Sequence, residues 1–182
     1  FLLYIHPSVF AGSSEWEKMK TLMQAILNYS FFPVISVLLL KAVNFISSVY
    51  LITQRDRIIP YVICNIWYFW IWFVWRGLTD SPKEIVLLSM AIFLASAIGL
   101  MANIYMKISM HTIAMGVTVS FMIFLAFTHP ANAGVYISVT LLIAGLVCTS
   151  RLIASNHSAK EIYSGLLAGF SAIILAALFV MQ

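Results

Sequence analysis

The stretch from Ser150 to Glu161 reads SRLIASNHSAKE and joins two long apolar runs, Val135–Val147 and Ile162–Met181. It places an arginine, a histidine and a carboxylate within a few residues of one another. Crossing the hydrocarbon layer takes about 20 helical residues, and charged groups beside hydrocarbon are costly unless they have a role. The pattern predicts two membrane-spanning helices joined by a polar turn that carries functional groups.

The composition of the rest of the chain supports the same class. Of 182 residues, 63% are hydrophobic and only 9% are charged, whereas soluble domains carry roughly 25% charged residues. We therefore expect one polytopic membrane domain. The net charge of +4 comes from scattered basic residues, so nothing indicates nucleic-acid binding. Cys64 and Cys148 lie in apolar runs and are expected to be buried as small hydrophobic residues.

Apolar stretches of spanning length occur six times, which predicts an all-α, six-transmembrane-helix bundle. Helices are expected because lipid offers no hydrogen-bond partner to an open backbone. An interfacial segment, residues 1–25, would precede a six-span domain, residues 26–182. The expected spans are approximately Ile26–Ile52, Ile58–Trp75, Ile85–Met106, His111 to just before His129, Val135–Ser150, and Ala159–Met181.

Counting crossings predicts which polar groups share a membrane face. We name the face on which the first span ends side A, and the opposite face side B. Loops after odd-numbered spans then lie on side A, and the others on side B. Side A should hold Arg55, Arg57, Lys107, Ser109, His111, Ser150, Arg151, His157 and Glu161. Side B should hold Arg76, Asp80, Lys83, Glu84 and His129.

The side A groups suit phosphate chemistry. His157 and Glu161 are four residues apart at a helix start, so they share one face. The carboxylate can accept one imidazole proton and leave the other nitrogen free to attack. Arg151 offers a planar fork that matches phosphate oxygens. His111 can protonate a leaving oxygen, and Lys107 and Ser109 can hold phosphate oxygens. Two histidines and several cations would suit phosphoryl transfer without a metal.

Two motifs carry a family resemblance. Ser150-Arg151, five residues, His157, three residues and Glu161 resembles the third signature of the type 2 phosphatidic acid phosphatase superfamily, Ser-Arg-x5-His-x3-Asp. Ser109-Met110-His111 is similar to the second signature, Pro-Ser-Gly-His. The first signature, Lys-x6-Arg-Pro, is absent near residues 100–107, where only Lys107 offers a cation. Arg55, Arg57 and Pro60 lie in an earlier side A segment that could replace it.

The resemblance implies a membrane-bound lipid phosphate phosphatase that needs no cofactor. It would hydrolyse a lipid phosphomonoester or diphosphate through a phosphohistidine at His157, with His111 as general acid and Glu161 orienting His157. Phosphate ligands would come from Arg151, Ser109, Ser150 and Lys107, with Arg55 and Arg57 in place of the first signature. The site would face outward from a bacterial inner membrane. The alternative is a catalytically impaired relative that binds a lipid headgroup or a partner protein.

Simpler interpretations remain open for single residues. His157 and Glu161 could be a helix-start pair or two metal ligands, and His111 an ordinary interfacial histidine. The basic residues on side A could be flanking charges or helix caps. Lys41 is expected near the middle of the first span, where a cation is a functional candidate. The aromatic run Trp67–Trp75 suits an interfacial anchor or a contact with a lipid chain. A small transporter is a third class, although no inverted repeat supports it.

Overall fold

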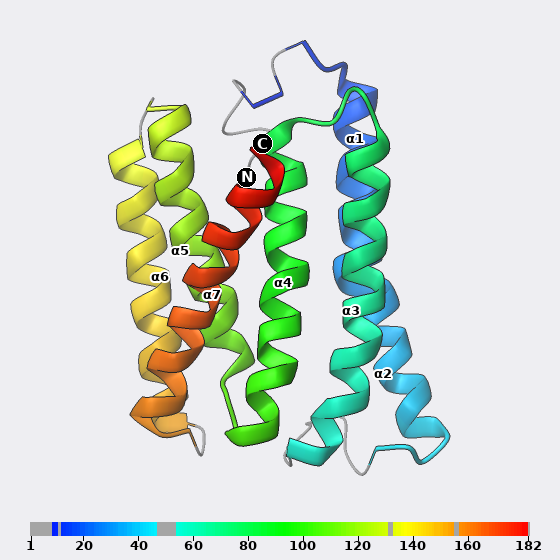
Figure 1. Ribbon diagram of the computed structural model, residues 1–182, viewed down its shortest axis with the longest axis vertical. Coiled ribbons are helices and arrows are strands. Elements are labelled where there is room, and N and C mark those ends of the chain that lie inside the picture. Colours follow the sequence, from blue (N-terminus) through cyan, green and yellow to red (C-terminus); the bar gives the residue numbers. More distant parts are fainter. Residues whose placement is uncertain (1–8, 11, 47–53, 131–132, 155–156, 182) are drawn as a thin grey trace.

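A computed structural model describes residues 9–10, 12–46, 54–130, 133–154 and 157–181, except the side chain of Arg55. Within these ranges all regular secondary structure is helical, and six stretches are long and apolar enough to cross a membrane. The prediction of an all-α, six-helix, multi-pass membrane protein is confirmed (Figure 1). The elements are α1 (Glu15–Ile26), the π-helix η1 (Leu27–Phe31), α2 (Phe32–Ala42), α3 (Gln54–Gly77), α4 (Lys83–Tyr105), α5 (Met110–Thr128), α6 (Ala133–Ala154) and α7 (Ala159–Val180).

The first span differs from its prediction at both ends. It is the continuous helix α1–η1–α2, which begins at Glu15 and ends at Ala42. The early start is fixed by a capping box, because the Ser14 hydroxyl accepts the Glu17 amide at 3.3 Å and the Ser14 amide donates to the Glu17 carboxylate at 2.8 Å. The chain then leaves the helix through Asn44, whose φ of 59° lies in the left-handed region. Lys41 is therefore in the last turn of the span, not near its middle.

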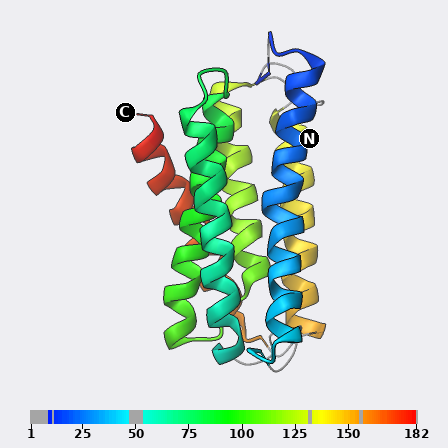
Figure 2. The ribbon, with the colours of Figure 1, turned by 90° about the vertical axis from the view of Figure 1, so that its right-hand side faces the viewer.

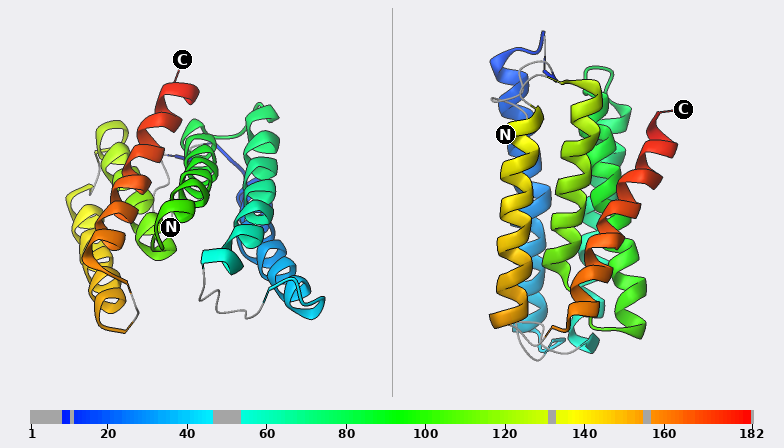
Figure 3. Two further views of the ribbon diagram at one scale, coloured as in Figure 1. Left: turned by 60° about the horizontal axis from the view of Figure 1, so that its bottom comes forward. Right: turned by 90° about the vertical axis from the view of Figure 1, so that its left-hand side faces the viewer.

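The helices form a bundle in which α4 lies between α3 and α7 (Figure 1). The first span packs along α3 (Figure 2), and α6 packs on α5 at the opposite edge of the bundle in Figure 1. Helix α7 crosses α4 and α5 obliquely, as both views of Figure 3 show. The fully buried positions Leu87 and Ala91 of α4, and Ala172 and Ala176 of α7, mark the centre of the core.

Side A is the lower end of the bundle in Figure 1, where α2, α4 and α6 end and α3, α5 and α7 begin. The crossing count made from the sequence is therefore confirmed. Three helix N-termini and two inter-helix turns meet at this end. Three helix C-termini meet there as well, so the helix dipoles largely offset one another and the side chains set the charge of this end.

Glycines bring α5 and α7 into backbone contact in the half of the bundle near side A. A Cβ added at Gly116 of α5 would overlap the backbone of Leu166, and one added at Gly169 of α7 would overlap the backbone of Ile113. Gly165 similarly packs on Thr112. The GxxxG pattern Gly165–Gly169 thus mediates close packing, as predicted. This contact fixes the first turn of α7 relative to the first turn of α5.

Candidate functional site

His157 and Glu161 form the hydrogen bond expected from their spacing. His157 Nδ1 lies 3.0 Å from Glu161 Oε2, and only 8% of the His157 side chain is exposed. The same carboxylate oxygen accepts the Ser158 amide at 3.0 Å, and the Ser158 hydroxyl accepts the Glu161 amide, which completes a capping box at the start of α7. When Glu161 accepts the proton on Nδ1, His157 Nε2 is left with its lone pair available. The helix cap therefore also sets the tautomer and orientation of His157.

Arg57 enters the same region from α3. It is a buried residue, 8% exposed, and its Nη1 donates to the Ile108 carbonyl at 3.1 Å. Ile108 lies in the turn between α4 and α5, directly before Ser109. This bond uses one of five guanidinium N–H donors. Arg57 thus joins α3 to the turn that carries Ser109 and His111, and the electrostatic influence of Glu161 and Arg151 reaches it.

His111 completes the group from the first turn of α5. The charged groups that act on it are Arg151, His157 and Arg57. Five polar side chains from four helices are therefore close enough for their charges to interact: Arg57 of α3, His111 of α5, Arg151 of α6, and the His157–Glu161 pair at the start of α7.

The charges of this group, which we name the side A cluster (Arg57, His111, Arg151, His157 and Glu161), do not balance. Among the described groups whose charges act on one another here, two guanidinium groups and two histidines face one carboxylate, Glu161. Gathering like charges in a partly buried place is unfavourable unless an opposite charge joins them. Arg57 and Arg151 are permanently charged, so the imbalance cannot be relieved by loss of a proton. The cluster is therefore complementary to an anion.

Ser109 lies at the edge of the cluster, at the N-cap of α5. The residue is fully buried, and its hydroxyl has no hydrogen-bond partner among the described residues. Its carbonyl, in contrast, accepts both the Thr112 hydroxyl at 3.0 Å and the Ile113 amide at 3.1 Å. Buried polar groups without partners are uncommon and call for an explanation. This oxygen is closed off in the structure, so the turn would have to shift before the hydroxyl could donate to a ligand held by the cluster.

Three of the predicted phosphate ligands are not placed in the cluster by any described contact. The Ser150 hydroxyl donates to the Val147 carbonyl at 2.8 Å, in its own helix, and the residue is exposed. Ser150 therefore does not join the cluster, because consecutive helical residues point about 100° apart and Arg151 is the one that turns inward. Lys107 is half-buried in the α4–α5 turn, and no described contact joins it to the cluster. The side chain of Arg55 lies outside the described part of the chain.

A pair of hydrogen bonds between α3 and α4 also supports the site, and it could not be predicted from the sequence. Gln54 Nε2 donates to the Asn103 carbonyl at 3.1 Å, and Asn103 Nδ2 donates to the Gln54 carbonyl at 2.9 Å. The two residues are 49 positions apart, so the sequence does not indicate that they pair. This reciprocal pair fixes the start of α3 to the end of α4, one turn before Arg57. It stabilises the position from which Arg57 reaches Ile108.

A metal site finds no support in the described ranges, where no group of three or more His, Cys, Asp and Glu side chains could hold an ion. Comparison with known proteins adds no assignment: no family model matches the chain, and neither the curated proteins nor the solved structures gave a match. The side A cluster is therefore the feature of this chain from which a function can be inferred.

Proposed function

We propose that this chain is an integral membrane lipid phosphate phosphatase related to the type 2 phosphatidic acid phosphatases, and that the side A cluster is its active site. The observation that supports this most strongly is the unbalanced positive charge around an oriented histidine. A phosphate monoester or diphosphate at the end of a lipid would supply the missing negative charge. It would also place a phosphorus atom beside a nucleophilic nitrogen.

In the proposed reaction, His157 Nε2 attacks phosphorus, the P–O bond to the lipid breaks, and a phosphohistidine forms. Glu161 keeps Nδ1 protonated and stabilises the imidazolium that develops. His111 gives a proton to the departing lipid oxygen. Water then attacks the phosphohistidine, His111 takes up a proton from that water, and inorganic phosphate leaves with His157 restored. The reaction consumes one water and needs no redox partner.

Arg57 and Arg151 hold the phosphoryl oxygens as charge develops on them. In this scheme Arg57 replaces the first signature that the sequence lacks. The bond to Ile108 places its guanidinium at the α4–α5 turn, beside His111, where it would serve the phosphate while it holds the turn. The Ser109 hydroxyl adds a neutral donor at the start of α5.

The second candidate is a catalytically impaired relative that binds a lipid headgroup or a partner protein. The specific observation in its favour is the packing of Arg57, which is buried and already donates to a backbone carbonyl. Such an arginine can be structural, and Arg151 would then be left as the main anion ligand. Binding without turnover would distinguish this function.

The test is phosphate release from prenyl diphosphate, phosphatidate and phosphatidylglycerol phosphate by the full chain in phospholipid nanodiscs. We expect turnover of at least one of these lipids and a loss of at least about 1,000-fold in His157→Ala, because the nucleophile is gone. His129→Ala is the matched control, since His129 pairs with Glu84 on side B. Brief incubation with ³²P-labelled lipid should give an acid-labile phosphoprotein in wild type and His129→Ala but not in His157→Ala.

Activity that survives His157→Ala would rule out this mechanism. Lipid binding that is weakened by Arg151→Ala, with no phosphate release from any of the three substrates, would support the headgroup-binding alternative. The orientation of the site follows the same proposal: we infer an outward-facing site in a bacterial inner membrane. Hydrolysis by intact cells of a phosphate lipid confined to the outer leaflet would support that orientation.

A further inference from the structure

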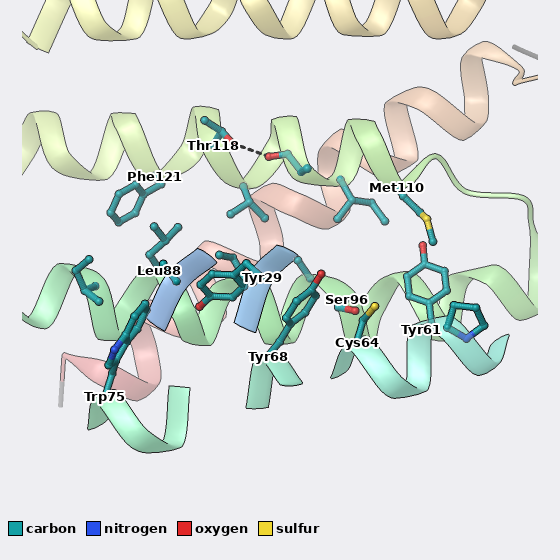
Figure 4. Close-up of a pocket in the computed structure, with 18 of the residues that line it drawn as sticks. Tyr29, Tyr61, Cys64, Tyr68, Trp75, Leu88, Ser96, Met110, Thr118 and Phe121 are labelled. Atoms are coloured by element: carbon teal, nitrogen blue, oxygen red, sulfur yellow. Dashed lines mark hydrogen bonds between the residues drawn. The ribbon is translucent and has the colours of Figure 1, made fainter. Parts of the chain in front are cut away.

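A cavity of about 640 Å³ lies within the bundle between the first span, α3, α4 and α5. Its lining is apolar for most of its length. Figure 4 shows Tyr61 and Met110 at one end and Trp75 and Phe121 towards the other, with Tyr68 and Tyr29 between them. Its walls come from separate spans, so bundle packing creates it.

One end of the cavity lies directly beside the side A cluster. Tyr61 is one helical turn beyond Arg57 on α3, and the two side chains interact electrostatically. Met110, on the opposite wall, directly precedes His111. A molecule whose head is held by Arg57 and His111 therefore has this cavity as its nearest apolar space inside the protein.

The π-helix η1 shapes the first-span wall of the cavity. A π-turn contains an extra residue, and it changes the direction in which the side chains before and after it point. Tyr29 of η1 lines the cavity, and its ring centroid lies 5.5 Å from that of Tyr68 and 6.1 Å from that of Trp75. On the α2 side of the turn, Trp67 Nε1 donates to the Ser36 hydroxyl at 3.2 Å and keeps α2 docked on α3. The first span thus stays attached to α3 while leaving space beside it.

We propose that this cavity binds one hydrocarbon chain of the lipid whose phosphate occupies the side A cluster. This inference rests on the proposed function, and it names the part of the substrate that the cluster does not contact. The occupant would be a single long alkyl or prenyl chain, with its polar end at Tyr61 and its terminus near Trp75. A second chain, where the lipid has one, stays in the surrounding bilayer.

The dimensions of the cavity support a single chain. Tyr61 and Trp75 are 14 residues apart on one helix, which corresponds to about 21 Å along its axis. A cavity of about 640 Å³ drawn out over this length is narrow, and its volume lies within the range of about 300–1,000 Å³ typical of pockets for one small ligand.

Tyr61 has a feature that matches the junction between head and chain. Its ring is 5% exposed, and its hydroxyl has no hydrogen-bond partner in the described part of the chain. A phenol hydroxyl in an apolar wall without a partner is unfavourable. This oxygen is closed off in the structure, so the ring would have to rotate to donate to the oxygen that links a hydrocarbon chain to its phosphate.

The experiment uses hexadecyl phosphonate with a diazirine at the chain terminus, because its C–P bond resists hydrolysis. The full-length protein is irradiated with it in phosphatidylcholine nanodiscs, and the adducts are mapped by mass spectrometry. We expect adducts concentrated around Trp75 and Phe121 and few on α6. Ala114→Phe should weaken binding at least about tenfold, since displacing two buried methylenes already removes that much affinity.

Ala114 lines the cavity and is not part of the buried core. A larger side chain there therefore enters the cavity without disturbing the core. Thr118→Phe, one turn further along the same wall, is the second blocking variant. Thr149→Phe on the exposed face of α6 is the matched control, and it should bind like wild type. Equal binding in Ala114→Phe, Thr118→Phe and Thr149→Phe would overturn the inference.

A second arm separates the substrate chain from ordinary bilayer lipid. A diazirine-labelled phosphatidylcholine should label the cavity weakly, and unlabelled hexadecyl phosphonate should displace it. Labelling by phosphatidylcholine that phosphonate cannot displace would overturn the inference. Because the phosphonate is not hydrolysed, cavity labelling is independent of turnover. Loss of turnover in His157→Ala without labelling of the cavity would leave the proposed function standing and remove the chain site.

Discussion

The two ends of the bundle handle their charged groups in opposite ways. On side B, His129 Nε2 lies 3.0 Å from Glu84 Oε1, and the Arg76 guanidinium lies 5.3 Å from the centre of the Trp72 ring. His129 and Arg76 thus each have a partner close at hand. On side A, among the described groups whose charges act on one another, two arginines and two histidines face one carboxylate. Both ends thus contain a histidine–carboxylate pair, so such a pair does not by itself indicate a functional site. The additional cations around the pair on side A are what indicate a site for an anion.

The largest expected difference between the two ends is in kcat/KM, when an arginine is removed from one end or from the other in separate variants. Arg151→Ala should lower kcat/KM for a lipid phosphate by about 100- to 1,000-fold, because it removes a donor to the charge that develops on the phosphoryl group. Arg76→Ala should leave kcat/KM within about twofold, since Arg76 lies over an aromatic ring on side B. Steady-state phosphate release by the two variants measures this. Equal losses would show that the two ends do not differ in function.

The second comparison exchanges the carboxylates of the two histidine pairs for amides. Glu161→Gln should lower kcat about 10- to 100-fold with little change in KM, because His157 loses the group that orients it. Glu84→Gln should leave both constants unchanged. The readout is the separate effect on kcat and KM. A change confined to KM in Glu161→Gln would contradict an orienting role and would indicate that Glu161 affects substrate binding instead.

The smallest expected effect concerns the packing that brings α7 to the cluster. Gly169→Ala should destabilise the protein by about 1–3 kcal/mol, because the added Cβ meets the α5 backbone and forces the helices apart. Gly145→Ala on α6 is the control, since a Cβ there meets nothing. Thermal unfolding in detergent should show a lower Tm only for Gly169→Ala. Equal Tm values would mean that α5 and α7 are held together elsewhere.

Much of this arrangement could be predicted from local sequence. Span lengths gave the six helices, and counting crossings placed the cluster residues on one side. The four-residue spacing gave the His157–Glu161 bond, because it depends only on helix geometry. The glycines of the last span indicated close packing, although only the structure identifies α5 as the partner.

What could not be predicted depends on tertiary packing or on competing local signals. Arg57 and Ile108 are 51 residues apart, and nothing in the sequence distinguishes Arg57 as the arginine that turns inward. The motif groups Ser150 with Arg151, but the Ser150 hydroxyl donates to Val147 in its own helix and the residue is exposed. The charged segment after Ser14 suggested an interface, while Ser14 and Glu17 begin a helix. The cavity has no sequence signature, because its walls come from four spans.

One carboxylate oxygen, Glu161 Oε2, serves both the backbone at the start of α7 and the ring of His157. The His157–Glu161 pair, which holds the proposed nucleophile, is therefore assembled within five consecutive residues as soon as α7 forms. The arginine half requires α3 and α6 to be in place. A newly inserted chain would thus hold His157 correctly oriented before it could bind a phosphate, so the order of helix assembly sets when the proposed activity first appears.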